Sequence, residues 1–186
     1  MKMAGDRLRC FVALTLDPAS RDALAAFPVA AGARRTPRDQ LHVTIAFLGA
    51  IERTKSERLG ARLAGLAAVD AVPPVGVERV VCWPSTAHAR LVVAELAPQP
   101  RLLALGERVA GALAELGLPP DSRAFKPHVT IARFPRDAHR VAPDGANDGA
   151  SRMPLALRFE TLTLYESVLT RAGAEHRVLA AAALPE

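Results

Sequence analysis

The chain has 186 residues, half of them hydrophobic, and its 24 Lys and Arg against 19 Asp and Glu leave a formal charge of +5. This length suits one compact domain with its own core, and a basic chain favours polyanionic partners such as nucleic acid. No segment reaches the roughly 20 consecutive apolar residues of a membrane span. The N-terminus lacks the pattern of a signal peptide, so we expect a cytoplasmic protein.

Hydrophobic periodicity predicts a chain in which strands and helices are mixed. Asp17-Pro18 is a typical helix start, and Gly117 with Pro119 is a typical helix end. In chain order, we expect a strand at 8–16, a helix at 17–27, a strand at 41–48, a helix at 54–69, strands at 75–82 and 90–96, a helix at 98–116, and strands at 125–134, 155–165 and 175–184.

Residues 135–154 are rich in Gly, Pro, Asp and Asn and are predicted to form a long loop. Several consecutive strands are close in sequence, which favours antiparallel pairing, and the mixture of elements indicates an α+β fold. Cys10 and Cys82 border apolar runs at a spacing that fits neither a metal motif nor a disulfide framework. We therefore expect both to be small core residues.

One tetrapeptide, His-Val-Thr-Ile, occurs twice, at residues 42–45 and at residues 128–131. Each copy lies in a predicted strand, where side chains alternate between two faces. The His and Thr of a copy therefore share one face, while the Val and Ile anchor the other face to a core. If a pseudo-twofold axis relates the two halves of the chain, two imidazoles and two hydroxyls surround a single point.

These groups suit cleavage of a phosphodiester. Displacement at phosphorus needs a base for the nucleophile and an acid for the leaving oxygen, and imidazole can take either role near neutral pH. The hydroxyls of Thr44 and Thr130 can donate to phosphate oxygens. Arg133 is a candidate for neutralising charge, but strict alternation puts it on the face of Ile131, so a twist or bulge is needed. A single strand histidine is usually structural; its repetition together with Thr favours chemistry.

At these residues the sequence resembles the 2H phosphoesterase superfamily, and within it the RNA 2′,3′-cyclic phosphodiesterases, also called 2′-5′ RNA ligases. The segments LHVTIAFLG (41–49) and FKPHVTIAR (125–133) carry the resemblance, with weaker support from FVAL (11–14) and LYES (164–167). The resemblance implies one bilobal α+β domain over residues 1–186. It has two antiparallel sheets related by a pseudo-twofold axis, helices on the outside and a basic cleft between the lobes.

The resemblance also implies that a 2′,3′-cyclic phosphate is hydrolysed to a 2′-phosphate without a metal or other cofactor, and that reversible 2′-5′ ligation is a second reaction. In family terms His42 protonates the departing 3′-oxygen and His128 activates water, although the residues alone leave these two roles open. Thr44, Thr130 and Arg133 would bind the phosphate. The expected partners are RNAs with cyclic phosphate ends, such as tRNA halves, and the expected state is a monomer.

One departure concerns His176, which stands where relatives often have a tyrosine, so that its role is either packing or substrate contact. Phe47 and Phe134 are candidates for stacking on a base, with core packing favoured for Phe47. Two other functions stay open: a phosphodiesterase for a small cyclic phosphate, such as ADP-ribose cyclic phosphate, and a non-catalytic protein that binds RNA ends. The intact histidines and threonines argue against the second.

Overall fold

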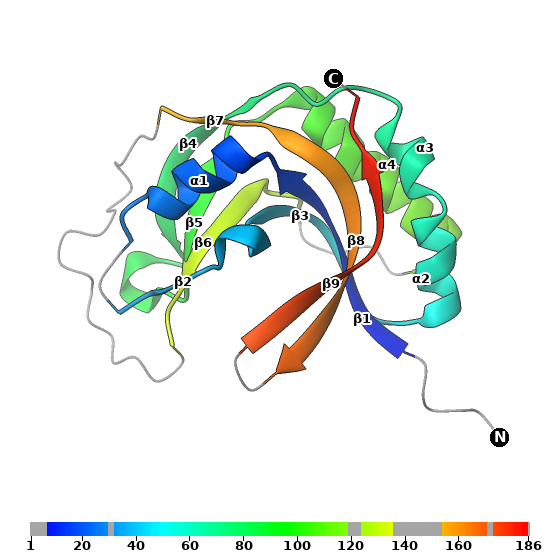
Figure 1. Ribbon diagram of the computed structural model, residues 1–186, viewed down its shortest axis with the longest axis horizontal. Helices are drawn as coiled ribbons and strands as arrows, with labels where there is room; N and C mark the ends of the chain where they lie inside the picture. Colours follow the sequence, from blue (N-terminus) through cyan, green and yellow to red (C-terminus); the bar gives the residue numbers. More distant parts are fainter. Residues whose placement is uncertain (1–6, 30–31, 119–123, 136–153, 171–172, 186) are drawn as a thin grey trace.

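The computed structural model of the chain describes residues 7–29, 32–118, 124–135, 154–170 and 173–185. Its centre is a large, strongly curved antiparallel sheet with helices outside it (Figure 1). The expected α+β class is confirmed. The loop predicted at 135–154 falls, apart from its two end residues, outside the described residues.

The observed elements agree with most of the predicted ones. The strands are β1 (Arg7–Leu16), β2 (Arg34–Arg35), β3 (His42–Glu52), β4 (Val75–Trp83), β5 (Leu91–Leu96), β6 (His128–Arg133), β7 (Ala156–Leu157), β8 (Phe159–Thr170) and β9 (Gly173–Ala183). The helices are α1 (Pro18–Ala26), α2 (Arg53–Gly60), α3 (Leu63–Ala67) and α4 (Pro100–Glu115), with short 3-10 turns η1 (Arg38–Gln40) and η2 (Thr86–His88).

Two predictions of secondary structure need correction. The single helix expected over 54–69 is divided into α2 and α3. The division follows Gly60, which lies so close to β9 that an added Cβ would be 3.0 Å from the Cβ of Ala180, and glycine weakens a helix interior. The connection between the helix predicted at 17–27 and the strand predicted at 41–48 contains a short strand that was not predicted, β2, whose backbone pairs with β6.

The sheet consists of two halves that meet at β3 and β6. Its strand order is β7-β4-β5-β6-β3-β1-β8-β9, with β2 also paired to β6. Among the described residues, the ladder between β3 and β6 is one bridge, Val43 to Val129, because β2 takes up the same edge of β6 further along. The two separate sheets that we expected are therefore one continuous sheet with a narrow junction.

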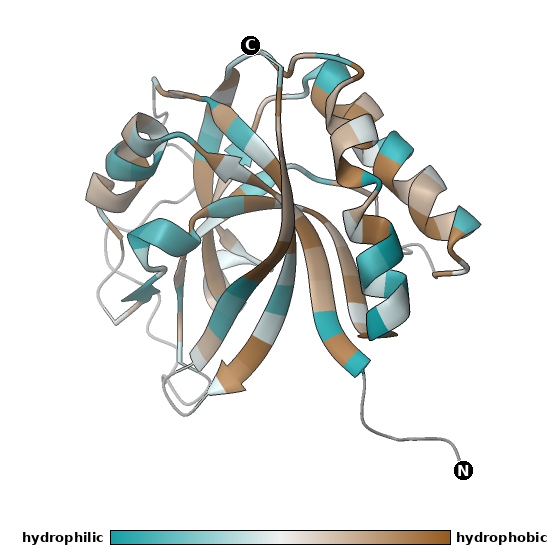
Figure 2. Cartoon of the chain, turned by 45° about the vertical axis from the view of Figure 1, so that its right-hand side comes forward, coloured by the Kyte–Doolittle hydropathy of each residue, from teal (hydrophilic) through white to brown (hydrophobic). Residues whose placement is uncertain are grey.

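The core lies on the face of the sheet opposite the repeated histidines. The motif residues Val43, Ile45, Val129 and Ile131 are buried, and α4 packs against β3. The buried residues of α4 recur every three or four positions and so form one face of the helix. Figure 2 shows polar and apolar residues alternating in bands along the strands. None of the described helices has the length and apolarity of a membrane span.

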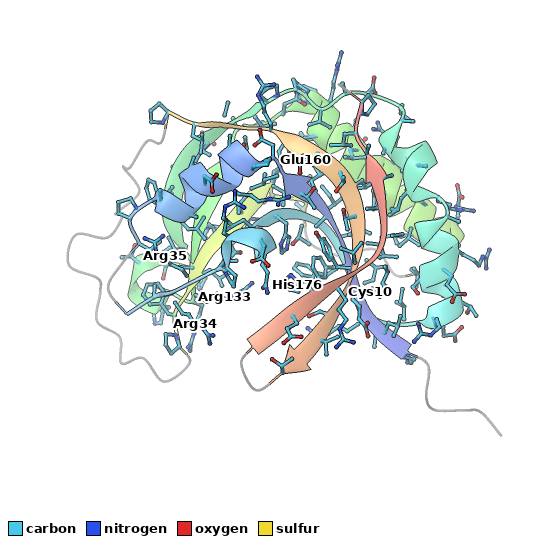
Figure 3. The ribbon with its side chains drawn as sticks, in the orientation of Figure 1. Cys10, Arg34, Arg35, Arg133, Glu160 and His176 are labelled. Carbon is cyan, nitrogen blue, oxygen red and sulfur yellow. The ribbon has the colours of Figure 1, made fainter. Side chains whose placement is uncertain are left out.

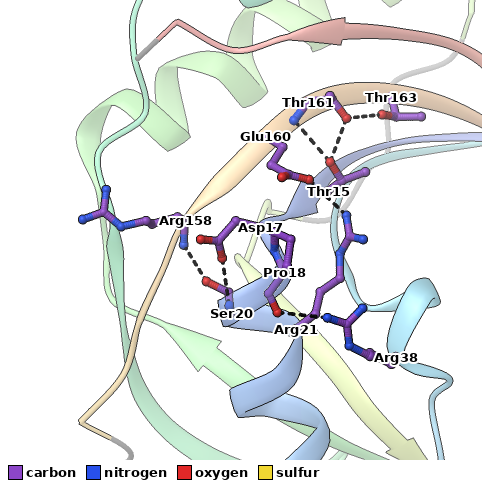
Figure 4. A network of polar contacts seen from close by, with 10 residues as sticks. All are labelled: Thr15, Asp17, Pro18, Ser20, Arg21, Arg38, Arg158, Glu160, Thr161 and Thr163. Atoms are coloured by element: carbon purple, nitrogen blue, oxygen red, sulfur yellow. Dashed lines mark hydrogen bonds and ion pairs between the residues drawn. The ribbon is translucent and has the colours of Figure 1, made fainter.

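The start of α1 is fixed to β8 by a polar network (Figure 4). The side chain of Asp17 accepts a hydrogen bond from the backbone N–H of Ser20 at 2.8 Å, as the predicted N-cap should. The hydroxyl of Ser20 in turn accepts from the backbone N–H of Arg158 at 3.0 Å. Both cysteines are buried thiols outside any disulfide among the described residues, as their apolar surroundings in the sequence predict.

Candidate active site

The register between β3 and β6 gathers the repeated histidines and threonines on one face. Continuing outward from the bridge between the two motif valines, His42 falls opposite Thr130, and Thr44 falls opposite His128. Directly opposite side chains share a face, with Cβ atoms about 5 Å apart. All four residues are half-buried. The two imidazoles therefore occupy diagonal corners of a four-residue cluster.

Arg133 joins this face because β6 contains a bulge. The register of β6 with β5 skips Ile131, and Ile131 and Ala132 are both buried although they are sequence neighbours. A bulge inserts one extra residue and so reverses the alternation that follows it. Arg133 consequently lies on the face of His128 and Thr130. This is the bulge that the sequence analysis required for Arg133 to reach the site.

The first copy of the motif has a bulge at the same position. The register of β3 with β1 skips Ile45, and Ile45 and Ala46 are both buried. Phe47, the counterpart of Arg133, therefore returns to the face of His42, where it is 54% exposed. The expectation that Phe47 packs in the core is wrong, because that expectation assumed an unbroken alternation.

Both catalytic candidates are oriented by a carbonyl two residues earlier in the chain. Nδ1 of His42 lies 2.7 Å from the carbonyl oxygen of Gln40, and Nδ1 of His128 lies 2.7 Å from that of Lys126. A carbonyl only accepts, so Nδ1 carries the proton in both rings and Nε2 is the basic atom of the neutral imidazole. Nε2 of His42 is 3.1 Å from the Thr44 hydroxyl.

The electrostatics of the site disfavour positive charge on the imidazoles. Burial is the main cause that lowers the pKa of His42 to about 4, and repulsion from His176 and Arg133 acts in the same direction. Burial also lowers the pKa of His128, which Arg133 lowers further and Glu95 opposes. Burial and Arg133 likewise lower the pKa of His176. Arg133 thus acts on all three imidazoles, and an anion placed among these groups would be stabilised.

His128 is supported by an aromatic ring and a carboxylate. The rings of Trp83 and His128 have centroids 4.4 Å apart. Nε1 of Trp83 donates to Oε1 of Glu95 at 2.8 Å, and Nε of Arg79 donates to Oε2 of the same carboxylate at 2.5 Å. Since Glu95 pairs with His128 across β5 and β6, this arrangement fixes one wall of the site.

His42 is supported by a cluster of aromatic rings. The ring of Phe11 lies 5.1 Å from that of His42, 5.1 Å from that of Tyr165 and 4.8 Å from that of His176, centroid to centroid. His176 is itself 5.4 Å from His42. The histidine whose role the sequence left open therefore lies in the site.

A chain of threonine hydroxyls joins β1 to β8 close in sequence to Tyr165 (Figure 4). The hydroxyl of Thr163 lies 2.7 Å from that of Thr161, which is 2.7 Å from that of Thr15. Tyr165 follows Thr163 by two residues in β8, so the hydrogen-bonded threonines hold the strand from which its side chain projects.

Two cavities adjoin the site. The smaller has a volume of about 240 Å³ and is lined by Asp39, Gln40, His42, Tyr165, Glu175, His176 and Arg177. The larger, of about 500 Å³, is lined by Arg90, Leu91, Arg133 and Phe134. Among the described residues, no group of three or more His, Cys, Asp or Glu side chains is arranged to hold a metal ion.

Sequence reasoning did not single out Phe11, Trp83 or Glu95, although each contacts or acts on a histidine of the motif. Tyr165, which belongs to the LYES segment, lines the smaller cavity. These residues reach the site through pairing between strands far apart in the chain. Apart from the FVAL segment, which contains Phe11, local spacing carries no signal for them.

Comparison with known families and sequences gives a consistent result. The family model described as the 2′-5′ RNA ligase superfamily matches residues 16–170. A curated protein of Archaeoglobus fulgidus, named RNA 2′,3′-cyclic phosphodiesterase, is 28% identical over 171 residues. That alignment covers 89% of this chain and 94% of the relative.

Solved structures share the fold over nearly the whole chain. The protein TT0787 of Thermus thermophilus superposes with a TM-score of 0.75 at 27% identity, covering 95% of this chain and 98% of that one. LigT of E. coli, crystallised with 3′-AMP, gives a TM-score of 0.68 at 25% identity, covering 97% and 100% of the two chains.

Proposed function

Since the chain belongs to the 2′-5′ RNA ligase superfamily and is thus a phosphoesterase of the 2H type, we propose that it opens the 2′,3′-cyclic phosphate at the end of an RNA to give a 2′-phosphate. The observation that carries the proposal is the bridge at which the two His-Val-Thr-Ile motifs pair with each other. The name of the Archaeoglobus relative supports the choice of reaction.

The phosphate is bound at the centre of the four-residue cluster. In-line displacement requires the base and the acid on opposite sides of phosphorus, and the diagonal positions of His42 and His128 provide two sides. Diagonal Cβ atoms in an antiparallel pair are about 7 Å apart, which leaves room for a phosphate between the rings. The hydroxyls of Thr44 and Thr130 and the guanidinium of Arg133 donate to its non-bridging oxygens.

The reaction needs one proton accepted and one donated. His128 takes a proton from water as the water oxygen attacks phosphorus, and His42 gives a proton to the departing 3′-oxygen. The low pKa of His42 in the ligand-free protein fits this role once substrate is present. The anionic cyclic phosphate favours the charged imidazole, so the acid gains its proton when the substrate binds. A ribose 5′-hydroxyl in place of water gives the 2′-5′ ligation.

Alanine at either motif histidine tests the proposal. The expected result for His42→Ala and for His128→Ala is a loss of turnover of about 10²–10⁴-fold, the usual contribution of one positioned acid or base. The matched control is His88→Ala, because His88 is an exposed histidine in η2. Full activity in the double variant would exclude the proposal, whereas a chelator should leave turnover unchanged.

The same residues would serve a small cyclic phosphate, such as that of ADP-ribose. Turnover of short RNAs, mononucleoside cyclic phosphates and ADP-ribose cyclic phosphate by one preparation separates the substrates. A preference for the ADP-ribose compound would identify the small cyclic phosphate, in place of an RNA end, as the substrate. The monomeric state and the cytoplasmic location stay predictions.

A further inference from the structure

A second arginine lies beside Arg133 on the catalytic face. Strand β2 pairs with β6 so that Arg34 is directly opposite Arg133, and both residues are exposed. Opposite residues of an antiparallel pair project from the same face, with Cβ atoms about 5 Å apart. Figure 3 shows the two arginines on the same side of the open face, across from His176.

Among the described residues, this arginine pair has no anionic partner. Like charges directly opposite each other are unfavourable. The ion pairs in the described part of the chain involve other arginines. Arg35, next to Arg34, instead donates to the carbonyls of Ala25 and Phe27. Two guanidiniums held side by side in this way suit a ligand with two phosphate groups.

The charges that line the two cavities differ, and they indicate where a second phosphate can lie. The cavity beside His42 includes the carboxylates of Asp39 and Glu175, with Arg177 as the one guanidinium in its described lining. The cavity that contains Arg133 also includes Arg90, and its described lining has no carboxylate. A phosphodiester is therefore favoured on the side of the arginines.

From the proposed function, on which this step rests, we propose that Arg34 binds the phosphodiester one nucleotide 5′ of the cyclic phosphate, while Arg133 binds the cyclic phosphate itself. The ligand class is an RNA strand of at least two nucleotides. The cavity lined by Arg90 and Phe134 receives the nucleoside on the 5′ side, with the ring of Phe134 beside its base. A mononucleoside cyclic phosphate makes none of the contacts with Arg34.

Two substrates with the same terminal nucleoside test this assignment. One is a mononucleoside 2′,3′-cyclic phosphate, and the other is the dinucleotide that ends in it. Arg34→Gln should lower kcat/KM for the dinucleotide about tenfold and leave that for the mononucleotide unchanged. Arg34→Lys should retain part of the preference for the dinucleotide, because the lysine ammonium still provides a positive charge. The matched control is Arg58→Gln, which removes an exposed arginine of α2.

A neutral linkage identifies the contact directly. A dinucleotide whose internal phosphodiester is replaced by a methylphosphonate should be as poor a substrate for the unaltered enzyme as the normal dinucleotide is for Arg34→Gln. The two changes should not add, because each removes the same interaction. The logarithmic salt dependence of dinucleotide binding should also fall by about one in Arg34→Gln.

The outcomes separate this inference from the proposed function. If the unaltered enzyme hydrolyses neither cyclic phosphate, the proposed function fails. If it hydrolyses both and Arg34→Gln affects the two substrates equally or not at all, only the assignment of Arg34 fails. Additive effects of the variant and the methylphosphonate would also overturn it, because the arginine would then act elsewhere.

Discussion

Val43 pairs with Val129 at the bridge between β3 and β6, and each is the second residue of its His-Val-Thr-Ile motif. An antiparallel pair that joins equivalent positions has a local twofold axis at that point. The axis passes between the two imidazoles, so the spacing of the two rings depends on this contact. Both valines are fully buried. Shortening either side chain therefore changes the packing at this contact.

We predict that Val129→Ala lowers turnover more than its loss of stability explains. Removing the two methyl groups should reduce the free energy of unfolding by about 2 kcal/mol, and the loosened bridge should reduce kcat about tenfold. Val75→Ala is the control, since Val75 is also buried but pairs with Leu157 of β7, at the edge of the sheet away from the junction. Urea unfolding and kcat would be measured for both. Equal kcat values in the two variants would contradict the prediction.

Stability should fall with acidity because of His42. Its pKa is about 4 in the folded protein, against the ordinary histidine value of 6.5, so the unfolded chain takes up the proton first as the pH falls. The stabilisation from the neutral ring is complete above about pH 6.5 and is lost as the pH falls towards about 4, up to about 3 kcal/mol. Unfolding free energies at several pH values would show this slope.

The variant His42→Phe isolates the contribution of that histidine. It cannot be protonated, so its unfolding free energy should depend less on pH between about 4 and 6.5 than that of the unaltered protein. Carboxylates contribute the same slope to both proteins and cancel in the difference. His88→Phe, at an exposed position, should retain the full slope. An unchanged slope in His42→Phe would show that the folded ring is not held neutral.

The strand positions and the shared face of each His and Thr were predictable, because alternation along a strand is a local property. The face of the sheet on which Arg133 and Phe47 lie was not predictable, because it depends on a bulge in each strand. The sequence does contain a sign of the bulge. In both copies an alanine follows the motif isoleucine, which puts two apolar residues side by side where alternation calls for one.

The pairing of β3 with β6 and the cluster of aromatic rings around His42 could not be predicted from the sequence, for a different reason. Whether β3 and β6 form one sheet depends on the packing of strands more than 80 residues apart. The ring of His176 reaches His42 only because β9 pairs with β8, which pairs with β1. A local pattern cannot specify such a route, so the role of His176 stayed open until the strand order was known.

A bound phosphate should raise the pKa of the motif histidines. An anion next to an imidazole favours its charged form, and His42 starts from a pKa of about 4. Proton NMR titration of the imidazole Cε1 protons, with and without a nucleoside 2′-phosphate, would show the titration of His42 and of His128 moving to higher pH. The nucleoside alone should leave both unchanged, and His88 is an exposed internal reference. No shift with the phosphate would place its binding elsewhere.

The roles of the two histidines can be assigned with a modified leaving group. A substrate whose bridging 3′-oxygen is replaced by sulfur releases a thiolate, which needs no proton because a thiol has a pKa of about 8.5. His42→Ala should therefore lose about 10²–10⁴-fold on the normal cyclic phosphate but regain most of this loss on the sulfur compound. His128→Ala should be impaired on both, since its water still needs a base.

The reversed pattern, with rescue of His128→Ala alone, would exchange the two roles and keep the paired mechanism. Rescue of neither variant would mean that protonation of the leaving group does not limit the reaction. Thr44→Ala is the control in this series, because its hydroxyl lies 3.1 Å from Nε2 of His42 and yet transfers no proton in the mechanism. It should slow both substrates by the same factor, since the phosphate that it helps to bind is common to them.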